Sequence, residues 1–158
     1  MTDTRVIGQT AGAHIPLWVR LSIPIFEPLL RAGIWAGPNG LITICGRKSG
    51  VLRTNGVAII SVSGRRWVWC PWGEPQWVRN LRAAGRATIT LRGRKEEVTA
   101  SELDREGRIE FFRDFFGPRV RGTPFGRTFV RVVDGVDVNR PPEQNAKGRP
   151  VFELHPIR

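Results

Sequence analysis

The chain has 158 residues, of which 41% are hydrophobic, and this length and composition favour one globular domain over a disordered polypeptide. Its formal net charge of +11 predicts attraction to polyanions (nucleic acid, anionic lipid or a multiply charged coenzyme) without choosing among them. The cysteines, Cys45 and Cys70, lack the spacing of a disulfide framework and are expected to be small buried side chains of a cytoplasmic protein. His14 and His155 have no cysteine nearby, so we expect no metal site.

The N-terminal region is predicted to hold a flexible stretch followed by a helix. Residues 1–14 are polar and mixed, and they show no secretory signal pattern. From Ile15 to about Leu30 apolar residues recur at helical spacing, while Pro24 and Pro28 are expected to kink or split the helix. Charged residues interrupt the stripe, so it cannot span a membrane. We expect it to pack on the domain, with peripheral membrane contact as the alternative.

Six short segments combine apolar or β-branched residues with turn residues at their ends, a pattern typical of strands. Short connections favour antiparallel pairing for most of them. The fold class predicted is therefore α+β and mainly β: one domain over residues 1–158, built as a closed or nearly closed barrel with helices packed outside. The strands are expected at residues 41–45, 57–63, 66–70, 86–92, 95–101 and 150–156.

Three helices are predicted after the second hairpin strand. Residues 76–84 form the first, ended by Gly85 in a left-handed conformation. Residues 104–116 form the second, whose phenylalanines are expected to face the core. In residues 123–138 the apolar positions fit the period of a helix as well as that of a strand, and Pro124 and Gly135 favour a helix. Residues 139–149 are predicted to be a polar loop.

The candidate binding site is a basic turn directly after the first strand. Two glycines there allow backbone N–H groups to turn toward a ligand. Guanidinium and ammonium groups suit a phosphorylated small molecule, although a solvated basic turn is the alternative interpretation. The turn comprises Gly46, Arg47, Lys48, Ser49 and Gly50, with Arg53 three positions further on.

The order of motifs resembles the deazaflavin-dependent nitroreductase family. The matching elements are Gly46-Arg-Lys-Ser-Gly50 with Arg53, a hairpin, Trp77-x-x-Asn80-Leu81, and a closing Pro-Val-Phe-Glu-Leu strand. The resemblance covers most of the chain and implies a split β-barrel oxidoreductase that uses coenzyme F420, of a kind found chiefly in actinobacteria.

The resemblance also implies which residues hold the coenzyme. Arg47, Lys48, Ser49 and Arg53 match positions that bind its phosphate and acidic tail. Trp77 and Asn80 match helix residues that line the same groove. The strand end along which the deazaflavin ring would lie is formed by Trp69, Cys70 and Pro71. Two alternatives stay open: Trp77 as a core residue, and Asn80 as the partner of a nearby backbone group.

The function implied is hydride transfer from reduced F420 to an electron-poor acceptor such as a quinone, an enone or a nitroaromatic compound. The coenzyme carries the chemistry, so no catalytic side chain is assigned. The rivals are a flavin mononucleotide (FMN) enzyme on the same barrel, a coenzyme carrier without turnover, and a nucleic-acid-binding module, which the scattered aromatic residues disfavour. Family members that reduce nitroimidazoles use tyrosines in the substrate pocket, and this chain has none. The acceptor, the proton donor and the oligomeric state stay open.

Overall fold

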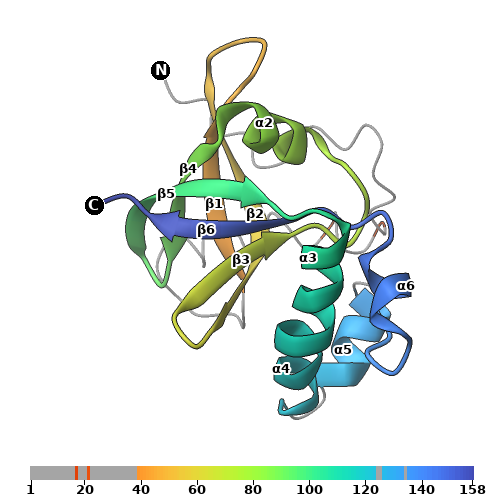
Figure 1. Cartoon of the computed structure of the whole chain (residues 1–158). Helices are drawn as coiled ribbons and strands as arrows, with labels where there is room; N and C mark the ends of the chain where they lie inside the picture. The colour runs from red at the N-terminus through yellow and green to blue at the C-terminus, as the bar shows by residue number, and fades with distance from the viewer. Residues whose placement is uncertain (1–16, 18–20, 22–38, 124–125, 134) are drawn as a thin grey trace.

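A computed structural model describes residues 17, 21, 39–123, 126–133 and 135–158, and within them six strands form a closed barrel (Figure 1). Neighbouring strands follow the order β1-β2-β3-β6-β5-β4, and every neighbouring pair is antiparallel. The predicted mainly β barrel is therefore confirmed. The strands are β1 (Asn39–Cys45), β2 (Leu52–Val62), β3 (Arg65–Trp69), β4 (Arg86–Leu91), β5 (Arg94–Glu102) and β6 (Val151–Pro156).

The predicted flexible stretch and N-terminal helix lie outside the described residues, apart from two leucines. Leu17 and Leu21 are helical and exposed. Among the described residues, no helix combines the length and the apolar character that crossing a membrane requires.

The barrel interior is filled by the inward side chains of alternating strand residues, among them Ile44, Ile59 and Val98. Strand β2 begins five residues earlier than predicted. Its polar start, Leu52–Gly56, looked like a continuation of the turn, but it pairs in register with β1, from Cys45 opposite Leu52 to Leu41 opposite Gly56. The ladder to β1 therefore extends the strand where the local sequence would not.

A second core lies outside the barrel, between the sheet and the C-terminal helices (Figure 1). On β3, Val68 points into the barrel, whereas Trp67 and Trp69 point outward. The indole of Trp69 meets Phe116 and Phe112 edge-on, with ring centroids 4.8 and 5.6 Å apart. These contacts confirm that the phenylalanine stripe faces the core.

The helix that carries this stripe runs further than predicted, through α3 (Arg105–Glu110), a π-helical turn η1 (Phe111–Phe116) and α4 (Gly117–Arg121). Pro118 has no N–H that could donate a hydrogen bond to a carbonyl of the preceding helical turn, and its ring needs space beside that turn. The wider π turn provides that room, and the Gly117 N–H bonds the Phe112 carbonyl five residues back. A β-carbon at Gly117 would lie 2.9 Å from that carbonyl oxygen, so the turn requires glycine.

Two short helices complete the described chain. Helix α5 (Gly126–Val133) confirms the helical interpretation for the middle of the 123–138 segment, and Gly135 after it has φ +67°. Helix α6 (Pro142–Ala146) lies where a loop was predicted. Pro142 suits a first helical turn, and the side-chain amide of buried Asn145 donates to the Asp137 carbonyl at 2.9 Å. This tertiary contact has no local sequence signal.

Candidate functional site

The connections that carry the predicted site residues meet at one end of the barrel. Strands β1, β3 and β5 run toward this end, and β2, β4 and β6 run away from it. The β1–β2 loop, residues 46–51, and the β3–β4 connection, which contains α2 (Gln76–Ala84), therefore both lie there (Figure 1). Helix α2 packs on β1, β4 and β5, and its Val78 and Leu81 are fully buried in the barrel core. As predicted, Gly85 ends this helix in the left-handed region.

The β1–β2 loop is a tight turn held by its own backbone. The Gly46 N–H donates to the Val51 carbonyl at 2.9 Å, and the Gly50 N–H donates to the Gly46 carbonyl at 2.8 Å. The hydroxyl of Ser49 accepts the Val51 N–H at 3.2 Å. Both glycines are required, because Gly50 has φ +69° and a β-carbon at Gly46 would lie 2.7 Å from the Ser49 hydroxyl.

Helix α2 holds Arg47 of this loop through two side-chain amides. The Asn80 Oδ1 accepts both the Arg47 backbone N–H at 3.3 Å and its Nη1 at 2.8 Å. The Gln76 Oε1 accepts the same Nη1 at 2.8 Å. Asn80 is 5% exposed, so its role as the partner of a nearby backbone group, one of the two sequence alternatives, is present in the structure.

The cations of the loop have no carboxylate partner among the residues that the structure describes. Between Pro28 and Gly73 the sequence contains no acidic residue. Among the described residues, Arg47, Lys48 and Arg53 form no ion pair. Arg53 lies on β2 and not in the turn, but its Nε is 3.7 Å from the position of a β-carbon at Gly46, so its side chain reaches back to the loop. Within the described part of the chain, no carboxylate therefore neutralises the positive charge at this end.

The first carboxylate after the loop in the sequence is engaged elsewhere. Glu74, just before α2, pairs with Arg82 at 2.8 Å, and Arg82 also pairs with Glu102 of β5 at 2.6 Å. This bridge ties the β3–β4 connection to α2 and to the sheet. Hydrogen bonding to the Arg82 guanidinium lowers the pKa of Glu74 below its usual value.

We expect this bridge to make stability depend on acid pH. Because the pKa of Glu74 is lowered in the folded state, its contribution is complete above the unfolded pKa, about 4.3, and is lost as pH falls through the folded value. The pair is half-exposed, so the contribution should be at most about 1 kcal/mol. In urea unfolding at pH 7 and pH 3, Glu74→Gln should reduce the pH difference in unfolding free energy relative to the wild type. An unchanged difference would contradict this.

At the strand end where the ring is expected to lie, the structure buries two side chains. The Trp69 side chain is 1% exposed in the outer core, and Cys70 is buried in the barrel core, with its N–H donating to the Pro150 carbonyl at 3.1 Å. Both side chains are therefore taken up by core packing, and the place of the ring along this strand end stays a prediction. Pro71 and Trp77 are partly exposed, and Trp77 packs against the barrel core with the rest of its surface.

The expectation of two buried thiols holds for Cys70 only. Cys45, the last residue of β1, is exposed, and its thiol donates to the Gly50 carbonyl at 3.3 Å. Sequence reasoning also missed Gln76. Its spacing of four residues from Asn80 places both amides on one helix face, which is the signal that could have found it. Among the described residues, no group of three metal-ligating side chains is present.

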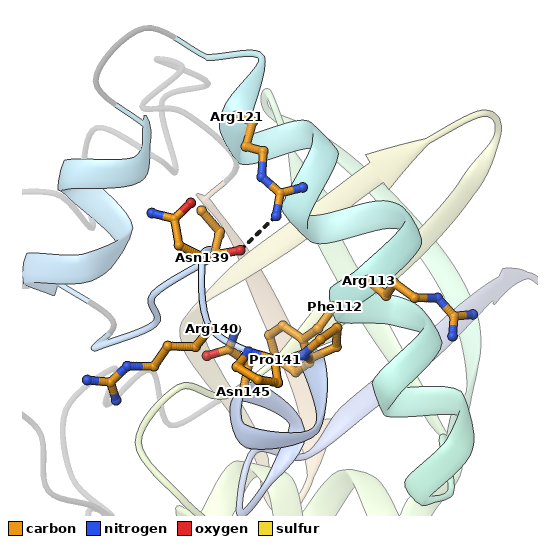
Figure 2. Close-up of a pocket in the computed structure, with 9 residues that line it drawn as sticks. Phe112, Arg113, Arg121, Asn139, Arg140, Pro141 and Asn145 are labelled. Carbon is orange, nitrogen blue, oxygen red and sulfur yellow. Dashed lines mark hydrogen bonds between the residues drawn. The ribbon is translucent and has the colours of Figure 1, made fainter.

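A separate pocket of about 370 Å³ lies on the helical side of the molecule, away from α2 and the β1–β2 loop (Figures 1 and 2). Its basic side chains do not converge: Arg113 pairs with Asp114, Arg121 donates to the Val138 carbonyl at 2.7 Å, and Arg113 and Arg140 point away from each other (Figure 2). This pocket therefore does not bring cations together as the β1–β2 loop does. It is lined by Phe112, Arg113, Arg121, Val138, Asn139, Arg140, Pro141, Pro142 and Asn145.

Comparison with known proteins gives one family and several solved structures. The family model described as F420H(2)-dependent quinone reductase matches residues 31–118. No protein with a curated description matches the sequence significantly. The heme storage protein HutZ from Vibrio cholerae is 13% identical, with a TM-score of 0.51 over 85% of this chain and 89% of that chain. This likeness concerns the barrel fold alone.

Two further solved structures are similar at lower TM-scores. An F420-H2 dependent reductase is 21% identical, with a TM-score of 0.49 over 75% of this chain and 94% of that chain. The conserved hypothetical protein Rv2991 from Mycobacterium tuberculosis is 14% identical, with a TM-score of 0.47 over 96% of this chain and 87% of that chain.

Proposed function

The chain belongs to the F420H2-dependent quinone reductase family, and on that basis we propose that it reduces a quinone and that the β1–β2 loop holds the coenzyme. It is an oxidoreductase whose coenzyme is F420. When bound, the reduced deazaflavin supplies a hydride to an electron-poor acceptor. The contribution of the chain is to bind, orient and shield the reacting groups.

The donor set of the loop fits the coenzyme, which is a phosphodiester that carries glutamates. Arg47, Lys48 and Arg53 offer positive charge that no carboxylate of the described residues neutralises. The backbone N–H groups of Lys48 and Ser49 likewise have no acceptor among the described residues. Charge-assisted bonds from these groups to phosphate and carboxylate oxygens are the strong class of hydrogen bond. This uncompensated loop is the observation that carries the proposal.

We assign no nucleophile among the described side chains, because the coenzyme carries the chemistry. Cys70 is buried and the Ser49 hydroxyl accepts the Val51 N–H within the turn. We propose that the exposed part of Trp77 forms one apolar wall for the ring, next to Gln76 and three residues before Asn80 on the helix that holds Arg47. Quinones are the first acceptor to test because the family description names them, and enones and nitroaromatics follow as the wider electron-poor class.

The test is a fluorescence titration of the protein with F420 and, in parallel, with FMN, followed by turnover of reduced F420 with a quinone, an enone and a nitroaromatic compound. We expect saturable binding of F420 alone and the fastest oxidation with the quinone. Binding of FMN alone would overturn the assignment of the loop to F420. If the protein bound F420 but oxidised it only with the nitroaromatic compound, the assignment of the loop to F420 would stand and the assignment of a quinone as acceptor would be overturned.

A further inference from the structure

We propose that Gln76 and Asn80 are positioning residues that aim one edge of the Arg47 guanidinium at the anionic group of the ligand. This inference rests on the proposed function, because it assumes that the β1–β2 loop receives the phosphate of the coenzyme. It assigns a role to Gln76 that the sequence does not predict. It also moves Asn80 from a direct ligand contact to a residue that acts through Arg47.

The hydrogen-bond count of the guanidinium carries the argument. Arginine has five N–H donors: one on Nε and two on each Nη. The Gln76 Oε1 and the Asn80 Oδ1 both accept from Nη1, each at 2.8 Å, so both Nη1 hydrogens are used. Nε and Nη2 have no acceptor among the described residues. These two nitrogens form one edge of the planar fork, which matches two oxygens of a phosphate or a carboxylate.

The two amides are themselves fixed in place. Gln76 and Asn80 are four residues apart and share one face of α2. The same helix is anchored by Val78 and Leu81, both with 0% exposure. Asn80 also accepts the Arg47 backbone N–H at 3.3 Å, which fixes the main chain as well as the side chain. The guanidinium is therefore held in one orientation before a ligand arrives, which reduces the entropy lost on binding.

The choice of amides over carboxylates preserves the charge of the arginine. A carboxylate at either position would accept the same hydrogens but would neutralise the cation that attracts the ligand. An amide oxygen orients the guanidinium and leaves its full charge available. Asn80→Asp therefore separates the geometry of the clamp from its electrostatics.

The experiment measures F420 affinity of the full chain by fluorescence titration for wild type, Arg47→Ala, Asn80→Ala, Gln76→Ala and the double variant Arg47→Ala/Asn80→Ala. Each single variant should weaken binding about 3- to 30-fold. The double variant should bind no more weakly than Arg47→Ala alone, because Asn80 acts through Arg47. In turnover, Asn80→Ala should raise the KM for reduced F420 and leave kcat unchanged.

Asn80→Asp gives a second measurement that a purely structural role would not move. It should keep the thermal stability of the wild type, weaken F420 binding, and flatten the dependence of the dissociation constant on salt. The control is Arg94→Ala, which removes an exposed cation from the start of β5, at the opposite end of the barrel, and should leave affinity unchanged.

The outcomes separate the two proposals. If wild type binds F420 and the losses of Arg47→Ala and Asn80→Ala multiply in the double variant, the positioning role is overturned and the proposed function stands. If wild type does not bind F420, both are overturned. Should Asn80→Ala fail to fold, Gln76→Ala with its Arg47→Ala double variant decides the question, because the Gln76 side chain is partly exposed.

Discussion

Replacing Lys48 and Arg53 together with alanine is expected to weaken F420 binding about 10²- to 10⁴-fold and to leave the barrel folded. Each lost charge-assisted contact should cost about 1.5–3 kcal/mol, or roughly 10- to 150-fold. Neither side chain forms an ion pair among the described residues, and both lie at the surface end of the β1–β2 hairpin. Their loss therefore removes ligand contacts without leaving a buried charge behind.

The measurement is the dissociation constant from fluorescence titration at low and at high ionic strength. The gap between wild type and the double variant should narrow as salt rises, because exposed charges are screened. Arg94→Ala is again the matched control, since it removes a cation at the other end of the barrel. If the Lys48/Arg53 double variant bound F420 within threefold of the wild type, the loop would be a solvated basic turn and not the binding site of the coenzyme.

Local sequence signals were sufficient to predict those helices and strands whose conformation depends mainly on their own residues. All six strands show β-branched or alternating patterns bounded by turn residues, and Gly85 marks the end of α2. The elements that were missed depend on distant partners. Leu52–Gly56 are a strand because β1 pairs with them, and α6 is a helix whose Asn145 bonds the Asp137 carbonyl. The π turn is accounted for by Pro118, but the contacts of its phenylalanines with Trp67 and Trp69 join residues more than 40 positions apart in the sequence.

The candidate site shows the same division. The cations of the loop are contiguous in sequence, so their composition and the family resemblance identify them together. The acceptors of Arg47 lie 29 and 33 residues away, at Gln76 and Asn80, and no local pattern connects them to the loop. The packing of the Trp69 side chain in the outer core was not predicted, for a different reason. A strand buried on both faces alternates between two apolar environments, so the pattern on β3 does not reveal which face meets a ligand.

Trp69 and Trp77 are expected to respond in opposite ways to replacement by alanine. Trp69 is 1% exposed between Phe112 and Phe116, so Trp69→Ala should lower the unfolding free energy by about 3–5 kcal/mol. The protein that remains folded should bind F420 within about threefold of wild type. Trp77→Ala removes a side chain that is only partly buried, so it should cost less stability but should weaken F420 binding about tenfold or more. Urea unfolding and fluorescence titration measure the two quantities on the same preparations.

The two variants serve as controls for each other, because both remove an indole that packs on a hydrophobic core: the outer core for Trp69 and the barrel core for Trp77. If Trp69→Ala weakened F420 binding without lowering the unfolding free energy, the ring would contact β3. Packing in the outer core would then not explain why a tryptophan is present at this position. If Trp77→Ala lost only stability, Trp77 would be a core residue of α2, and the wall of the coenzyme groove would have to come from elsewhere. The expected pattern, stability at Trp69 and affinity at Trp77, would locate the coenzyme at the α2 end of the barrel independently of the cations.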